Sequence, residues 1–242
     1  GGKRFRPILV LSACEAVGGD AKRALLPACA VEMIHSYSLV HDDLPALDND
    51  EFRRGMPACH KKFGEAIAIL TGDALLTHAF RLLGEVQPAE TALRLNQELA
   101  EAAGTQGMIG GQVMDILASD KDSSEFTRRH ADLINKNKTG RLIEASAVMG
   151  ALVGTRSAVN LKRIRSFGQA LGLAFQVVDD IMDGDGYLRL MSIEEAQNKL
   201  KSLITKAKRE AESFASRGKR IYELAEFLWS RTQDYAAVGL KN

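Results

Sequence analysis

Helical periodicity runs along almost the entire chain. Between Ala24 and Asp43, related residues recur at steps of three and four, which is the spacing of one helix face. The residues at these steps are Leu25, Ala28, Cys29, Glu32, His35, Leu39 and Asp42. Further helices are predicted over residues 61–84, 91–118, 126–153, 158–183, 192–215 and 217–231. Strand-like alternation is absent, so the pattern predicts an all-α fold, a single domain over residues 1–242 with long helices around a central cavity.

Composition narrows the class of protein further. Of the 242 residues, 45% are hydrophobic, which is enough for a sizeable core, and the net charge of +1 gives no electrostatic reason to expect nucleic acid. The three cysteines form no metal-binding spacing and favour a reducing compartment, so a cytoplasmic protein is expected. The longest apolar run, residues 167–178, is too short to span a membrane, and integral membrane association is not expected.

Two acidic clusters mark the ends of apolar helical stretches. One is HDDLPALD at residues 41–48, and the other is QVVDDIMD at residues 176–183. Carboxylates are costly to bring into an apolar bundle unless they are paired or bind metal. Two such clusters, far apart in sequence, suggest one shared site that holds Mg²⁺ against a polyphosphate, because Mg²⁺ favours oxygen ligands.

The second cluster presents its acids on one helical face. Gln176, Asp179 or Asp180, and Asp183 fall at helical steps from one another, and carboxylates at this spacing repel unless a cation joins them. A solvated acidic helix end would explain one such cluster equally well, but not two.

The first cluster has a wider spacing. Asp42 and Asp48 are six residues apart and would not align on a straight helix. Pro45 disfavours helical geometry at the preceding residue, so the helix must distort or end there and could bring Asp48 back beside Asp42. The alternative is an exposed acidic turn.

Basic residues supply the complementary charge. Lys3 and Arg6 lie near the start of the sequence, Arg53 and Arg54 follow the first cluster, and Lys138-Thr139 lies in mid-chain. Each alone is more often a surface charge or a salt-bridge partner. Together with the acids they indicate a clamp of metal and arginine for diphosphates.

Two residues precede the first cluster on its helix. His35 lies seven residues before Asp42 and so on the same face, which favours contact with a ligand over a structural role. Tyr37 lies five residues before Asp42, where its ring would be either plain core or the floor of a tunnel.

These motifs resemble those of the trans-isoprenyl diphosphate synthases, the bacterial farnesyl diphosphate synthases in particular. A single acidic motif is weak evidence, whereas an ordered set over nearly the whole chain is specific. The matching segments are GKRFRP at 2–7, HSYSLVHDD at 35–43, RRG at 53–55, TGD at 71–73, GQ at 111–112, KTG at 138–140 and FQVVDD at 175–180.

The resemblance implies the isoprenoid synthase fold, a homodimer, Mg²⁺ as cofactor, and isopentenyl and allylic diphosphates as substrates. The implied Mg²⁺ ligands are Asp42, Asp48 and Asp179, with Asp43, Asp180 and Asp183 nearby as ligands or in support. The residues implied to hold the allylic diphosphate are Arg53, Lys138, Thr139 and Gln176. Those implied to hold isopentenyl diphosphate are Lys3, Arg6, His35 and Arg54. The residues implied to carry catalysis are Asp42, Asp48, Arg53, Lys138 and Asp179, and Tyr37 with Ser38 would set a fifteen-carbon product.

Two departures from the family stand out. The family has a helical segment before the Gly-Gly-Lys motif and a lysine-rich loop after the second cluster, and neither is in this sequence. The loop is either deleted or omitted from the sequence, and omission is favoured because the residues from Tyr187 onward resemble the family's next helix.

Rival functions are a geranylgeranyl diphosphate synthase, a class I terpene cyclase, a non-catalytic synthase subunit and a metal-stabilised helical structural protein. A cyclase normally has a different second metal motif, and a non-catalytic subunit usually loses one aspartate cluster. The structural protein would not need this set of basic residues.

Overall fold

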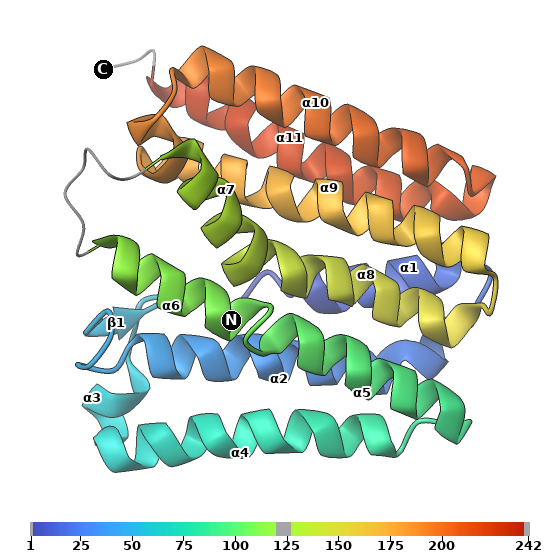
Figure 1. Cartoon of the computed structure of the whole chain (residues 1–242), viewed down its shortest axis with the longest axis horizontal. Coiled ribbons are helices and arrows are strands. Elements are labelled where there is room, and N and C mark those ends of the chain that lie inside the picture. Colours follow the sequence, from blue (N-terminus) through green and yellow to red (C-terminus); the bar gives the residue numbers. More distant parts are fainter. Residues whose placement is uncertain (1, 120–126, 240–242) are drawn as a thin grey trace.

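The computed structural model describes residues 2–119 and 127–239, and these form a layered helical bundle (Figure 1). The all-α prediction is confirmed. The first half contains α1 (Phe5–Ala16), η1 (Ala21–Ala24), α2 (Leu25–Asp42), β1 (Phe52–Arg53), β2 (Met56–Pro57), α3 (Cys59–Phe63), α4 (Glu65–Gly84), α5 (Ala89–Ala103) and α6 (Met108–Ser119). The second half contains α7 (Arg128–Asn135), η2 (Lys136–Gly140), α8 (Arg141–Gly154), α9 (Ala158–Asp183), η3 (Gly186–Arg189), α10 (Ile193–Glu212), η4 (Ala215–Gly218) and α11 (Lys219–Gly239).

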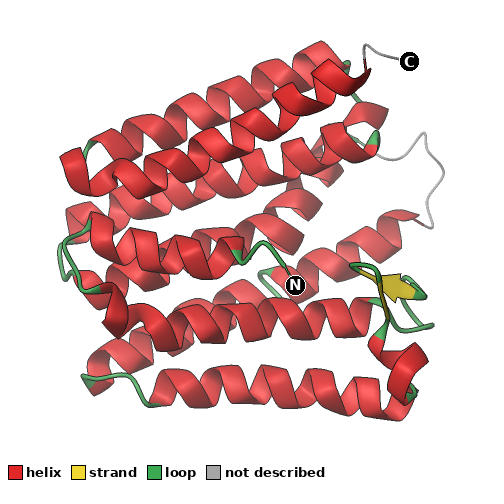
Figure 2. Ribbon diagram, turned by 180° about the vertical axis from the view of Figure 1, so that it is seen from behind, coloured by secondary structure: helices red, strands yellow, loops and turns green. Residues whose placement is uncertain are grey.

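Helices α1 and α8 lie at the centre and separate two apolar cores. One core joins them to α9, α10 and α11, and the other joins them to α2, α4 and α5. Every residue of α8 from Leu142 to Val153 is buried, as expected for a largely apolar central helix, and its one buried acid, Glu144, is paired with Arg141 and Arg165. Figure 2 shows the same layers from behind, with the short hairpin at one end of the bundle.

Several element boundaries differ from the sequence prediction. The predicted helix 61–84 is interrupted at Gly64, whose φ of 88° no other residue type adopts readily, and 91–118 is broken between Ala103 and Met108. Helix α1 was not predicted. The structure adds one short hairpin to the helices, because β1 and β2 pair antiparallel through a turn in which Arg54 and Gly55 both have positive φ, the conformation that closes a tight hairpin.

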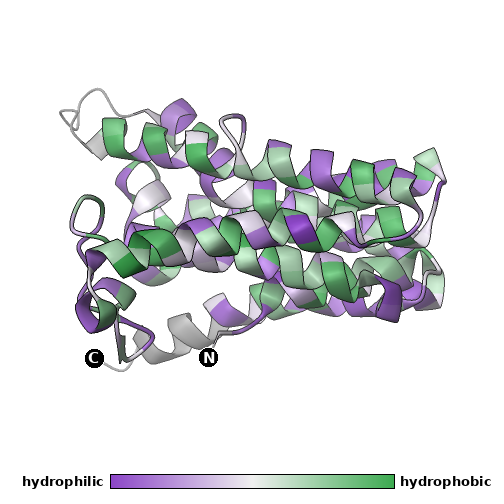
Figure 3. Cartoon of the chain, turned by 90° about the horizontal axis from the view of Figure 1, so that it is seen from below, coloured by the Kyte–Doolittle hydropathy of each residue, from purple (hydrophilic) through white to green (hydrophobic). Residues whose placement is uncertain are grey.

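Helix α4, rather than residues 167–178, is the stretch of the described chain that comes nearest to a membrane span in length and composition. By length and composition it could cross a membrane, with a mean hydropathy of 1.4 over a window of which only 22% is buried within the chain. Ile67 and Leu70 are among its exposed apolar residues. Figure 3 views the bundle from the side that carries this helix. Exposed apolar surface of this kind marks a candidate interaction surface.

Candidate active site

The first acidic cluster folds back on itself where α2 ends. The Asp48 N–H donates to the Asp42 carbonyl at 2.9 Å, so the two acidic residues that are six apart in sequence become neighbours, as the position of Pro45 predicted. Burial raises the pKa of Asp42 to about 6, Lys138 opposes this shift, and the negative charge of Asp48 adds to it. Burial and the nearby negative charge of Asp48 both disfavour the ionised form of Asp42, so a cation near Asp42 would stabilise its carboxylate.

Asp43 and Arg53 form a salt bridge with each other. Asp43 is 2% exposed and accepts a hydrogen bond from Arg53 Nε at 2.7 Å, and a second Arg53 nitrogen also contacts it. Arg53 reaches Asp50 as well, at 2.7 Å. The hydrogen bond to Asp43 is the main cause that raises the pKa of Arg53. This pairing fastens the hairpin to the end of α2. The roles that the resemblance implies, Asp43 near the metal and Arg53 at the allylic diphosphate, stay predictions.

Asp180 in the second cluster is also turned inward. Its carboxylate accepts hydrogen bonds from the Gln176 amide at 2.8 Å, the Tyr187 N–H at 2.9 Å and the Asn135 amide at 3.3 Å. Asp180 and Gln176 thus anchor the link after α9, which is two residues long before η3 begins. Asp183 is exposed at the helix end. The loop expected to be missing at this point stays a prediction.

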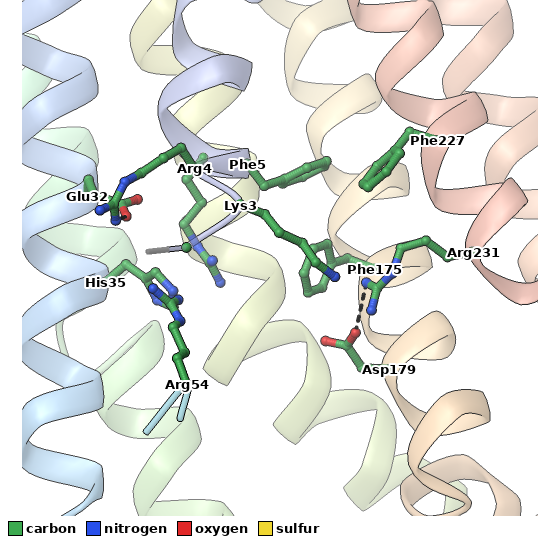
Figure 4. Close-up of a pocket in the computed structure, with 12 residues that line it drawn as sticks. Lys3, Arg4, Phe5, Glu32, His35, Arg54, Phe175, Asp179, Phe227 and Arg231 are labelled. Carbon is green, nitrogen blue, oxygen red and sulfur yellow. Dashed lines mark hydrogen bonds and ion pairs between the residues drawn. The ribbon is translucent and has the colours of Figure 1, made fainter. Parts of the chain in front are cut away.

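Asp179 points to a different side of α9 from Asp180 and meets the C-terminal helix α11. Arg231 Nη1 donates to its Oδ1 at 3.2 Å, as Figure 4 shows. Burial raises the pKa of Asp179, and Arg231 works against that shift. Arg231 lies 52 residues further along the chain, and no pattern in the sequence linked the two.

Beside Asp179 lies a cavity of about 470 Å³ that we call the cationic cavity (Figure 4). It brings together all four residues assigned to isopentenyl diphosphate, namely Lys3, Arg6, His35 and Arg54. Its other lining residues are Gly2, Arg4, Phe5, Glu32, Phe175, Asp179, Phe227 and Arg231. Basic side chains outnumber acidic ones here, so an anion of high charge suits the space.

Electrostatics within this cavity also favour an anion. Burial lowers the pKa of Arg6 to about 10, and among the described residues its Nε has no hydrogen-bond partner. Arg6 also lies over the Phe175 ring, 5.9 Å from its centroid. Burial, followed by the neighbouring arginines, lowers the pKa of His35 to about 3, so its imidazole is neutral at physiological pH.

A second cavity of about 350 Å³, the apolar cavity, shares Arg6 and His35 with the first. It contains five more of the predicted residues, Tyr37, Ser38, Asp42, Lys138 and Thr139, and is otherwise lined by Leu39, His41, Leu47, Met108, Ile109, Gln112, Val113 and Ile116. Tyr37 is 5% exposed, and its ring meets that of His41 edge-on at 5.8 Å. No partner for its buried hydroxyl is found among the described residues.

Lys138 enters the apolar cavity from an irregular turn. It lies in η2, a single π-helical turn, an irregularity that is frequent at functional sites. A side chain at Gly111 of α6 would come within 2.2 Å of the Lys138 backbone nitrogen, so glycine permits the two segments to touch. Lys138 Nζ pairs with Asp115 of α6 at 2.6 Å. The sequence reading missed Asp115, although it lies one turn beyond Gly111.

The donor chemistry fits Mg²⁺. Asp42 and Asp48 offer carboxylates where α2 ends, and Asp179 and Asp183 offer two more from α9. Within residues 2–119 and 127–239, no three histidine, cysteine, aspartate or glutamate side chains lie close enough to hold a metal ion by themselves. Mg²⁺ commonly binds through one or two carboxylates and completes its shell with waters and substrate phosphates, so this arrangement suits an ion that arrives with a diphosphate.

Comparisons with known proteins agree with this geometry. A farnesyl diphosphate synthase of Bacillus subtilis is 39% identical over 254 residues, covering 96% of this chain and 85% of that protein. This alignment is longer than the chain itself, so the Bacillus protein has internal residues without a counterpart here. The large subunit 1 of a heterodimeric geranylgeranyl pyrophosphate synthase of Arabidopsis thaliana is 50% identical over 76% of this chain, which spans only 51% of that relative.

Solved structures and a family model extend the comparison to the fold. An FPP/GFPP synthase of Zymomonas mobilis superposes with a TM-score of 0.90 at 36% identity, covering 94% of this chain and 84% of that one. The polyprenyl synthetase model matches residues 1–212, a span that contains both acidic clusters and every residue of the two cavities except Phe227 and Arg231. The chain therefore belongs to the polyprenyl synthetase family.

Proposed function

We propose that this protein condenses isopentenyl diphosphate head-to-tail with dimethylallyl or geranyl diphosphate to give farnesyl diphosphate, releasing diphosphate. One observation carries the proposal. A cationic and an apolar cavity share the wall formed by Arg6 and His35, and an acidic cluster borders each of them. Such a pair of spaces suits one substrate that is held by its diphosphate and another that extends an apolar chain.

The residues divide between the two substrates. Lys3, Arg6 and Arg54 would bind the diphosphate of isopentenyl diphosphate, and neutral His35 adds a hydrogen bond without altering charge. Lys138 and Thr139 would bind the allylic diphosphate at the mouth of the apolar cavity. Both sites rely on charge-assisted hydrogen bonds, which are stronger than neutral ones.

The reaction begins when the carbon–oxygen bond of the allylic diphosphate breaks and its electron pair leaves with the diphosphate. Mg²⁺ held by the acidic clusters would neutralise the negative charge of that leaving group. The apolar cavity, with Leu47 and Val113 in its wall, keeps water from the allylic cation. The double bond of isopentenyl diphosphate then forms the new carbon–carbon bond, and the proton lost from the adduct passes to the released diphosphate.

Tyr37 supports the farnesyl product. The names of the relatives do not separate the possibilities, because a farnesyl diphosphate synthase of Geobacillus stearothermophilus at 47% identity stands beside the Arabidopsis geranylgeranyl enzyme at 50%. Tyr37 lies in the wall of the apolar cavity, five residues back from Asp42, where its ring would stop chain growth. A geranylgeranyl diphosphate synthase is the alternative.

A homodimer would cover the apolar surface of α4. Ile67, Ile69 and Leu70 are all exposed on the first half of this helix. A second copy offers the same surface, and two-fold dimers are the commonest assembly. The Arabidopsis relative is named as the large subunit of a heterodimer, so a different family member is the competing partner.

The decisive experiment measures products of the purified protein supplied with isopentenyl diphosphate and each allylic diphosphate. We expect Mg²⁺-dependent farnesyl diphosphate, with Asp42→Ala and Asp179→Ala each reducing turnover by orders of magnitude while circular dichroism is unchanged. Asp185→Asn, an exposed acid on the same link that pairs with Arg189, serves as the matched control and should retain activity. A cyclic hydrocarbon product would indicate a terpene cyclase, and failure of the wild-type protein to consume isopentenyl diphosphate would contradict the proposal.

A further inference from the structure

The three residues before α1 form one edge of the cationic cavity. Gly2, Lys3 and Arg4 all line it, and Arg4 is the residue that immediately precedes the helix. Arg4 has φ 50° and ψ 33°, the left-handed conformation that residues with a Cβ adopt only at a cost in conformational energy. The rest of the structure must therefore hold it there.

The side chain of Arg4 is turned toward α2 rather than toward the other basic residues. It forms an ion pair with Glu32, whose side chain is 17% exposed against 52% for Arg4 (Figure 4). Glu32 lies one helical turn before His35 on α2. In a cavity rich in positive charge, Glu32 thus has a specific partner at the start of α1.

The segment is also held on its other side. A Cβ at Gly2 would come within 2.2 Å of the Arg54 guanidinium, so the backbone of Gly2 lies directly against that group. Arg54 likewise has positive φ, 55°. Of the four non-glycine residues with positive φ in the described parts of the chain, two line this one cavity. Strain of this kind collects at functional sites when the surroundings enforce it.

We propose that the Arg4–Glu32 pair is a clasp that positions Lys3 for the diphosphate of isopentenyl diphosphate. The inference rests on the function proposed for the cationic cavity. Lys3 is an exposed, flexible cation, and its reach is set by the backbone on either side of it. The ion pair of Arg4 with Glu32 fixes that backbone to α2, and on the other side of Lys3 the Gly2 backbone lies against Arg54. Arg4 and Glu32 are positioning residues, and they select the isopentenyl substrate without touching the allylic one.

The competing explanations make different predictions. If Arg4 bound the diphosphate directly, its loss would add to the loss of Lys3. If Arg4 mattered only through its left-handed backbone, Arg4→Gly would behave like the wild type, because glycine adopts that conformation without cost. If the pair served stability alone, thermal unfolding would change and the Michaelis constants would not.

The test combines calorimetric binding of isopentenyl diphosphate with steady-state kinetics for both substrates. We expect Arg4→Gln, Arg4→Gly and Glu32→Gln each to raise the Kd and KM for isopentenyl diphosphate by about tenfold, within the range of couplings between contacting residues. The kcat and the allylic KM should stay within about twofold of the wild-type values, because residues that share no contact with a substituted site are coupled to it only weakly. In a Lys3→Ala background, Arg4→Gln should have no further effect, and the exchanged pair R4E/E32R should recover most of the lost affinity.

Additive losses in the Lys3→Ala background would overturn the clasp, as would an Arg4→Gly variant with wild-type binding or an effect on the allylic KM alone. Arg4→Gln keeps the test decisive if Glu32→Gln fails to fold, since Arg4 is the more exposed member of the pair. If the wild-type protein consumes isopentenyl diphosphate and the variants bind it with the same Kd as the wild type, only the clasp is refuted. A wild-type protein that neither binds nor consumes it would refute the proposed function as well.

Discussion

Replacing Tyr37 with alanine should lengthen the product. Tyr37 lies five residues before Asp42 on α2, which at the rise of an α-helix places it about 7–8 Å from the acidic cluster. Its ring is buried in the wall of the apolar cavity of about 350 Å³. Removing the ring extends that cavity along the helix, so a fifteen-carbon chain can enter and react again. We expect geranylgeranyl diphosphate or a longer product in place of farnesyl diphosphate.

The same substitution should reduce stability. Truncating a buried aromatic side chain to alanine costs roughly 3 kcal/mol or more when the site cannot collapse. Because one side of this ring faces a cavity, we expect a loss of unfolding free energy near about 3 kcal/mol. For a chain of this size that loss corresponds to a fall of about 6–12 °C in Tm. Thermal unfolding therefore has to be measured first, and product assays run well below the new Tm.

Tyr37→Phe is the matched control. The Tyr37 hydroxyl is buried without a hydrogen-bond partner among the described residues, so its removal relieves the cost of an unsatisfied polar group, about 1–3 kcal/mol. The ring remains, so product length should not change and Tm should rise or stay equal. The readout is chromatography of dephosphorylated products from both variants and the wild type.

Two results would refute the reasoning. A farnesol peak unchanged in Tyr37→Ala would show that the ring does not end the tunnel. A twenty-carbon product from the unmodified protein would make it a geranylgeranyl diphosphate synthase, with the stop at some other residue.

Three further predictions concern charge, pH and assembly. Arg54→Ala should raise the KM for isopentenyl diphosphate by an amount equivalent to roughly 1.5–3 kcal/mol, the value of a hydrogen bond to a charged group, and a change confined to the allylic KM would mean that the two diphosphate sites are reversed. The folded-state pKa of His35, about 3, lies below the roughly 6.5 of an unfolded chain, so the unfolded state binds the extra proton and stability should fall as the pH drops from 7 to 5. Urea unfolding should show a smaller fall for His35→Gln, and equal falls would exclude this contribution. Leu70→Glu on α4 should convert a dimer to a monomer in sedimentation at micromolar concentration, whereas Val159→Glu, an equally exposed apolar site on α9, should not; a wild-type monomer with full activity would contradict the dimer.

The sequence by itself determined the helical class and most of the helices, and it predicted the chemistry of the site. Helical periodicity is local, so it indicated α2, α9 and α10, and the structure shows that a Ser192–Glu195 capping box begins the last of these. Pro45 indicated that Asp48 returns to Asp42, because a proline constrains its immediate neighbours whatever the fold. The ordered motifs named Lys3, Arg6, His35 and Arg54 before any geometry showed that they share one cavity.

Only the tertiary structure decided how each charge is used. Adjacent aspartates have different surroundings because successive helical residues point about 100° apart, so Asp179 meets Arg231 while Asp180 is buried under hydrogen bonds from Gln176 and Tyr187. The pairing of Asp115 with Lys138 likewise joins separate elements. Such contacts depend on how helices pack, and packing is set by the summed fit of many apolar side chains, which leaves no local pattern in the sequence to identify a single distant partner.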